Sequence, residues 1–226
     1  MRYLDAAQLE PENELILTRL PDELSTRSEI THYVEEAKSA MNLQGAYERV
    51  PVIERENERV NLGGTWFASR VLRINLEKAE EVFPYVITCG NEFEKWYSEQ
   101  SLLRKYYLDT VSGAVVSVAQ EKLMSLIENQ HNIPQTSRIS PGSLPDWPIE
   151  QQRKLFHLLG KEELEKELGL RLTDSCLMLP SKSVSGLVFS AEHDFESCQL
   201  CPREDCEGRK SPFDPEKAKY YREYPL

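Results

Sequence analysis

The longest helix expected in this chain runs from Leu102 to about Ile127, a stretch without proline. Four small residues lie along it and would let another backbone approach closely, as in ordinary helix packing: Gly113, Ala114, Ser117 and Ala119. A helix of this length needs an apolar layer to pack against. The rest of the chain must supply that layer.

Strands and further helices are predicted around this long helix, but they do not alternate regularly. Val82–Thr88 is the best strand candidate, and Thr136–Ile139 and Val184–Phe189 also have the composition of strands. Between the last two, Asp146 is expected to begin a helix that ends at Leu159. Irregular mixing of helices and strands favours an α+β fold over a doubly wound parallel sheet.

Two phrases in the second half of the chain carry the clearest chemistry. Residues 138–143 read Arg-Ile-Ser-Pro-Gly-Ser, and residues 172–190 contain Leu-Thr-Asp-Ser-Cys-Leu-Met-Leu-Pro followed by Ser-Val-Ser-Gly-Leu-Val-Phe-Ser. Arg138 offers a planar fork of donors that suits a carboxylate. The Pro-Gly step after it lets the backbone turn sharply and approach a ligand without a Cβ in the way.

These phrases resemble the activation (S-adenosylmethionine-binding) domain of cobalamin-dependent methionine synthase. That family has an Arg-x-x-x-Gly-Tyr motif in a Pro-Gly loop, a Leu-Thr-(Glu/Asp)-Ser phrase and a Ser-Val-Ser-Gly phrase, in this order. Two positions differ here: Ser143 stands at the tyrosine of the motif, and Leu187-Val188 stand at an aromatic pair. The resemblance implies a twisted antiparallel sheet with helices packed around it.

The resemblance also implies a ligand site. Arg138 would hold the amino-acid end of S-adenosylmethionine, and the loop after it would contact the ligand through its backbone. The small residues of the second phrase would form the floor of the groove. The candidate cofactor-binding residues are Arg138, Ser140, Pro141, Gly142, Ser143, Ser185 and Gly186.

A cysteine-rich segment follows these phrases, and the family resemblance does not extend to it, so its function is inferred from its residues alone. Cys198, Cys201 and Cys206 have a spacing that allows thiolates to share one metal ion, and the Cys-Pro step is typical of iron–sulfur ligand loops. An iron–sulfur cluster, zinc, redox-active thiols and a reduced, unliganded loop all remain open. A fourth ligand could come from Cys89, Cys176 or His193. We expect an activation-domain-like domain over residues 1–190 and a cysteine-rich tail over residues 191–226.

The composition excludes several classes of partner. A formal net charge of −11 argues against a nucleic-acid partner, because such binding depends on Lys and Arg. The sequence has no apolar run near the ~20 residues needed to span a bilayer, and no signal-peptide pattern at Met1, so a cytoplasmic location is expected. We find no catalytic triad order, phosphate loop or dinucleotide-binding glycine pattern, and no catalytic side chain is predicted.

The resemblance finally implies a function. We expect a stand-alone reactivation module for a cobalamin-dependent methyltransferase, either methionine synthase or a related corrinoid protein. It would bind S-adenosylmethionine for the reductive methylation of cob(II)alamin, with flavodoxin or ferredoxin as the electron donor. The alternative is an electron-transfer or docking protein for a corrinoid partner, which would carry an iron–sulfur cluster on its cysteine-rich tail and bind no S-adenosylmethionine.

Overall fold

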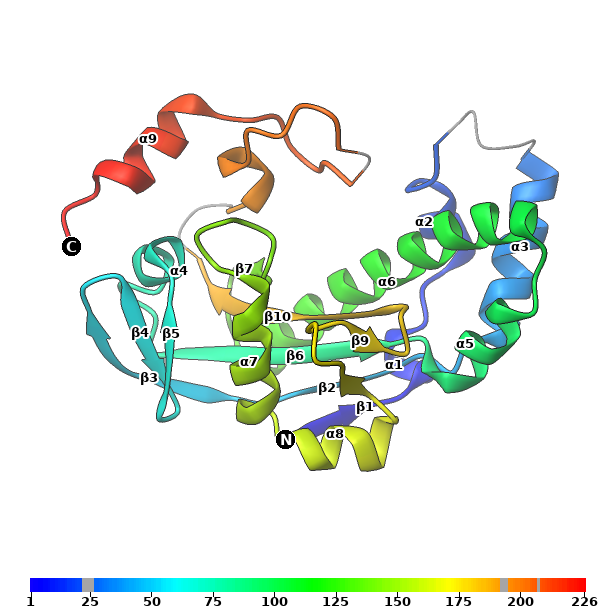
Figure 1. Cartoon of the computed structure of the whole chain (residues 1–226), viewed down its shortest axis with the longest axis horizontal. Helices are drawn as coiled ribbons and strands as arrows, with labels where there is room; N and C mark the ends of the chain where they lie inside the picture. Colours follow the sequence, from blue (N-terminus) through cyan, green and yellow to red (C-terminus); the bar gives the residue numbers. More distant parts are fainter. Residues whose placement is uncertain (22–26, 192–194, 207) are drawn as a thin grey trace. The chain divides into compact units, whose positions relative to one another are not determined.

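The computed structural model describes residues 1–21, 27–191, 195–206 and 208–226 (Figure 1). The chain divides into two compact units. Unit 1 comprises Met1–Tyr47, Val86–Asn129 and Gly160–Val184, and unit 2 comprises Glu48–Tyr85, Gln130–Leu159 and Ser185–Leu226. Unit 2 therefore contains residues on both sides of position 190, where we expected the cysteine-rich tail to begin. The separate tail stays a prediction.

Unit 1 is mainly helical. Its elements are β1 (Arg2–Leu4), α1 (Ala6–Leu9), α2 (Asn13–Leu17), α3 (Arg27–Ala40), β2 (Gln44–Tyr47), α5 (Gly90–Ser98), most of α6 (Leu102–His131), α8 (Lys161–Leu168), β8 (Arg171–Leu172) and β9 (Met178–Leu179). Strands β1 and β2 are antiparallel with Tyr3 opposite Ala46, and β8 pairs with β9 in the same sense. Gly169 ends α8 in the left-handed conformation at φ +63°.

Helix α6 confirms the predicted long helix and continues as far as His131. Its buried residues include Leu108, Val115 and Leu123, which form an apolar stripe along the helix. The expected close approach at Gly113 is wrong, because a Cβ built there would meet no atom within 4 Å. Gly113 is exposed, so this glycine is not explained by packing.

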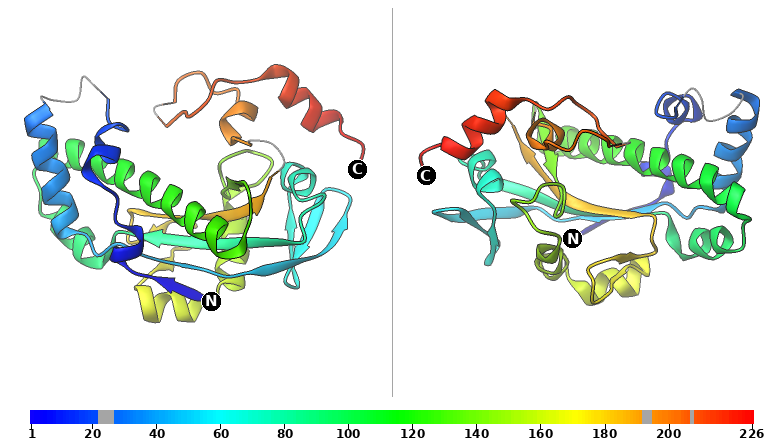
Figure 2. Two further views of the ribbon diagram at one scale, coloured as in Figure 1. Left: turned by 180° about the vertical axis from the view of Figure 1, so that it is seen from behind. Right: turned by 45° about the horizontal axis from the view of Figure 1, so that its top comes forward.

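Unit 2 holds most of the strand residues. Its elements are β3 (Val50–Glu56), β4 (Arg59–Leu62), β5 (Thr65–Ala68), α4 (Arg70–Asn75), part of β6 (Glu81–Thr88), β7 (Thr136–Ile139), the 3-10 turn η1 (Ile149–Gln151), α7 (Gln152–Leu158), most of β10 (Ser183–Ser190), the 3-10 turn η2 (Ser197–Leu200) and α9 (Pro215–Glu223). The predicted strands β6, β7 and β10 are confirmed. Helix α4 packs against β4, and Figure 2 shows it at one end of β4 and β5.

The pairings in unit 2 are antiparallel. Strand β3 pairs with β6 and with β4, β4 pairs with β5, and β7 pairs with β10. The sides of the strands that face inward share one hydrophobic core, in which Phe67, Trp147, Phe189 and Tyr221 are large buried members. The expected α+β class, an antiparallel sheet accompanied by helices, is therefore confirmed.

Candidate functional site

Strand β7 places Arg138 on the side of the sheet away from the core of unit 2. Arg138 lies opposite Val188 on β10, and its neighbour Ile139 lies opposite Leu187. Ile139 and Leu187 belong to the core cluster, so alternation along each strand turns Arg138 and Val188 to the other face. Arg138 is half-buried and Val188 is fully buried. Arg138 therefore lies opposite a buried apolar residue, on the face of this strand pair that points away from the core cluster.

The loop after β7 is closed by its own hydrogen bonds. The Gly142 amide donates to the Trp147 carbonyl at 2.7 Å, and the amide and hydroxyl of Ser143 both donate to the Ser140 carbonyl, at 3.1 and 2.7 Å. Gly142 has φ +82°, and a Cβ there would lie 3.0 Å from Cδ1 of Ile149. This position needs glycine for both reasons. The backbone of the predicted ligand loop is therefore fixed.

Strand β10 brings the second phrase directly against this loop. A Cβ built on Gly186 would lie 2.7 Å from the carbonyl oxygen of Ile139, 2.7 Å from Oγ of Ser140 and 3.0 Å from the Tyr85 ring. Ser185 beside it is buried. Residues more than forty positions apart in the sequence therefore touch, and Gly186 has no side chain because no space is left for one. Of the other candidates, Pro141 is buried while Gly142 and Ser143 are exposed.

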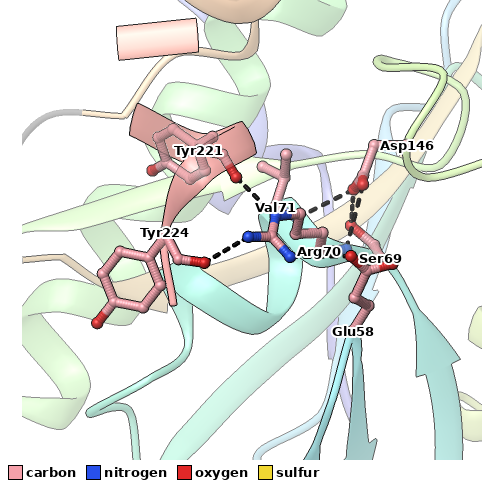
Figure 3. A network of polar contacts seen from close by, with 7 residues as sticks. All are labelled: Glu58, Ser69, Arg70, Val71, Asp146, Tyr221 and Tyr224. Atoms are coloured by element: carbon pink, nitrogen blue, oxygen red, sulfur yellow. Dashed lines mark hydrogen bonds and ion pairs between the residues drawn. The ribbon is translucent and has the colours of Figure 1, made fainter. Parts of the chain in front are cut away.

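Asp146 has a structural role that the sequence did not reveal. We expected it to begin the helix that ends at Leu159, but that segment opens with η1 after Pro148, which provides no side-chain cap. The Asp146 carboxylate instead accepts hydrogen bonds from the Arg70 amide at 3.2 Å, the Val71 amide at 3.0 Å and the Ser69 hydroxyl. It therefore caps α4, 75 positions away in the chain, next to the loop (Figure 3).

Arg70, at the start of α4, holds the C-terminal helix in place. Its guanidinium donates to the carbonyl oxygens of Tyr221, at 2.8 Å, and Tyr224, and it pairs with Glu58 at 2.8 Å (Figure 3). These carbonyls lie at the C-terminal end of α9, where helix carbonyls lack partners and a cation is favoured. The hydroxyl of Tyr221 also donates to Asn75 at 2.8 Å. The end of the chain is thus built into unit 2.

The three clustered cysteines lie on η2 and in the loop that follows. Cys198 and Cys201 are half-buried and Cys206 is exposed, and none forms a disulfide. Over the described part of the chain, no three side chains of His, Cys, Asp or Glu already surround one point. Of the three candidates for a fourth ligand, Cys89 and Cys176 are buried in unit 1, and His193 lies outside the described residues.

A small cavity in unit 1 does not contribute to this site. Its volume is about 30 Å³, which suits a single water molecule and not a nucleoside. The residues that line it are Ala6, Glu10, Pro11, Lys38, Met41, Leu43 and Val115. None of them is a candidate ligand residue. Within the described ranges, no helix is both long and apolar enough to cross a membrane.

The comparisons with known proteins agree with this arrangement of strands and loop. The fold is similar to that of a solved structure titled "Crystal Structure of the MetH Reactivation Domain bound to AdoHcy", with a TM-score of 0.56 at 15% sequence identity, covering 87% of this chain and 81% of that chain. Residues 117–202 match the family model described as "Vitamin B12 dependent methionine synthase, activation domain". The search of curated proteins found no match.

The recognition made from the two phrases is therefore confirmed by sequence and by fold. The matched span contains every candidate ligand residue from Arg138 to Gly186, together with Cys198 and Cys201. Cys206 lies beyond it. The loop and strand that carry the two phrases thus lie within the span that is similar to the methionine synthase activation domain, and the last of the three clustered cysteines lies outside that span.

Proposed function

We propose that this chain binds S-adenosylmethionine at the Arg138 loop and serves the reductive reactivation of a cobalamin-dependent methyltransferase. The observation that carries the proposal is the contact between Gly186 and Ser140, because it joins the two phrases that resemble one family. The family match over residues 117–202 supports it. The solved relative is described as bound to AdoHcy, the demethylated product of the same ligand.

The residues present suit the polar ends of S-adenosylmethionine. The ligand has a carboxylate, which the fork of Arg138 can bind through two parallel hydrogen bonds. Backbone groups of the closed loop, held by the Gly142–Trp147 hydrogen bond, can contact the rest of the ligand at little further entropic cost. Ser185 and Gly186 carry little side-chain bulk, which lets strand β10 pack directly against this loop.

In the proposed reaction the protein positions the ligand and performs no acid–base step. The electron donor would supply one electron to the partner's cobalamin, and the bound ligand would supply its sulfonium methyl group, so that S-adenosylhomocysteine would remain on this chain. Holding the sulfonium methyl toward the metal converts a bimolecular encounter into a reaction between fixed groups. A partner of the methionine synthase or corrinoid type, an electron donor such as flavodoxin or ferredoxin and a cytoplasmic setting are parts of the same proposal.

Three residues at two places in the motifs adjust the expected affinity. Ser143 and Leu187-Val188 replace aromatic residues of the family, and Val188 is fully buried opposite Arg138. Loss of a stacking or cation–π contact weakens binding by roughly 1 kcal/mol, which corresponds to about fivefold. The ligand is therefore expected to bind more weakly than a site with both aromatics would allow.

The test is a calorimetric titration of S-adenosylmethionine into the purified protein. Loss of the charged fork in Arg138→Ala should weaken binding about 10- to 100-fold, as expected for a hydrogen bond to a charged group. Arg153→Ala removes an exposed arginine of α7 in the same unit and is the matched control. Equal affinity in Arg138→Ala and the control would remove Arg138 from the site. Absence of binding by the unaltered protein at millimolar ligand would favour the docking alternative.

A further inference from the structure

The loop that carries the clustered cysteines is organised around Arg209. Its guanidinium donates to the carbonyl oxygen of Cys198 at 3.2 Å, to that of Cys201 at 3.3 Å and to that of Arg203. The Arg209 amide donates to the carbonyl oxygen of Cys206 at 3.1 Å. One residue therefore bonds to the backbone of all three cysteines.

The two ends of this loop are also tied together. The amide of Asp214 donates to the carbonyl oxygen of Gln199 at 2.9 Å, and Nζ of Lys217 donates to the side chain of Gln199 at 2.5 Å. The Asp214 carboxylate then caps α9 through the Lys217 amide at 3.0 Å. Because the ends are fixed, ordering the loop around a ligand costs less chain entropy than it would in a free tail.

The sulfur of Cys198 is held by the backbone of the same loop. The backbone amide of Lys210 donates to Sγ of Cys198 at 3.4 Å. This hydrogen bond is a structural observation that the cysteine spacing in the sequence does not contain.

We propose that Cys198, Cys201 and Cys206 ligate a thiophilic metal centre, either the iron of an iron–sulfur cluster or Zn²⁺. Cys206 is exposed and turns toward the two half-buried thiols when the metal binds, since the described side chains do not yet surround a common point. Three protein thiolates leave one coordination position for water or a small exogenous ligand.

The metal centre adjoins the proposed ligand loop. The hydroxyl oxygens of Ser143 and Ser197 lie 3.5 Å apart, and Ser197 directly precedes Cys198. The inference does not depend on S-adenosylmethionine binding, because the contacts of Arg209, Lys210 and Asp214 given above do not involve Arg138. Either proposal can fail while the other stands.

The experiment is anaerobic reconstitution of the full chain, once with Fe²⁺ and sulfide and once with Zn²⁺, followed by desalting. Bound iron, acid-labile sulfide and zinc are then measured together with the visible absorption and the number of free thiols. We expect one centre per chain and protection of three of the five thiols. Iron with sulfide and visible colour identifies a cluster, whereas retained zinc without colour identifies zinc.

Matched variants test which thiols bind. Cys198→Ser, Cys201→Ser and Cys206→Ser should each lower metal retention at least about tenfold, because the loss of even a partner that only orients a ligand costs about 10- to 100-fold in metal affinity. Cys176→Ala removes a buried cysteine outside the loop and should retain the metal. Arg209→Lys keeps the positive charge but loses the planar fork of donors that holds the loop, so this variant should also retain less metal.

Circular dichroism checks that every variant is folded. A protein that retains neither metal, or serine variants that retain as much as Cys176→Ala, would overturn the proposal.

Discussion

Replacement of Gly186 by alanine tests how the two phrases are packed. The new methyl group would lie 2.7 Å from the carbonyl oxygen of Ile139, 2.7 Å from Oγ of Ser140 and 3.0 Å from the Tyr85 ring. The Ser140 hydroxyl can rotate away, but a backbone carbonyl between paired strands and a fully buried ring cannot. Strand β10 must therefore shift relative to the loop.

The expected cost follows from overpacking. Inserting a methyl group into a well-packed region costs about 1–3 kcal/mol, and two contacts this short argue for the upper part of that range. Gly113→Ala is the matched control, because its methyl group would meet nothing within 4 Å and lies on the exposed side of α6. That change should raise the free energy of unfolding by about 0.4–1 kcal/mol, since alanine favours the helix.

Urea denaturation of both variants, monitored by circular dichroism, gives the two free energies of unfolding. Titration with S-adenosylmethionine should in addition show weaker binding in Gly186→Ala only, since the shift displaces the ligand loop. If Gly186→Ala were as stable as the unaltered protein, the close packing of β10 against the loop would be refuted.

Three further perturbations test other parts of the structure. Asp146→Ala removes the carboxylate that accepts the first two amides of α4 but leaves the N-cap residue Ser69, so it should lower the free energy of unfolding by about 1–2 kcal/mol in urea denaturation, whereas an unchanged value would refute this role. Arg70→Lys loses the fork that binds the end of α9, so limited proteolysis should cleave the C-terminal segment faster; an equal rate would contradict that anchoring. Burial acts to raise the pKa of Asp109, but hydrogen bonds from Lys182 and Tyr97 outweigh it and hold the pKa below its ordinary value. The stabilisation is therefore present above the ordinary pKa and lost as the pH falls through the lower folded value, so acid titration should destabilise Asp109→Asn less than the unaltered protein.

Elements defined by local pattern could be predicted from the sequence. Helix α6 and strands β6, β7 and β10 are long enough, or apolar enough, for their own residues to decide the secondary structure. The family phrases predicted the antiparallel sheet. Asp146 was misassigned because it stands where a helix cap for its own segment would stand, yet it caps a helix 75 positions away. Only the tertiary fold could reveal that partner.

The candidate site was predictable where a local motif marks its residues, and not where a residue acts through tertiary contacts. Gly142 and Gly186 were singled out by motif, and the structure shows why each is glycine: one has a positive φ, and the other has no space for a Cβ. The roles of Arg70 and Arg209 were not predictable, because both donate to backbone carbonyl oxygens. Every residue has such a carbonyl, so the residue type at the accepting position does not reveal the contact. The small residue Gly113 misled the prediction, since a helix can carry glycine on an exposed side.

Hydrogen–deuterium exchange of the whole chain, with and without S-adenosylmethionine, tests the central claim most directly. The account predicts slower exchange in peptides that cover the loop 140–147 when the ligand is added, and no such change in Arg138→Ala. Unchanged exchange in this loop at saturating ligand, or protection confined to segments of unit 1, would contradict it.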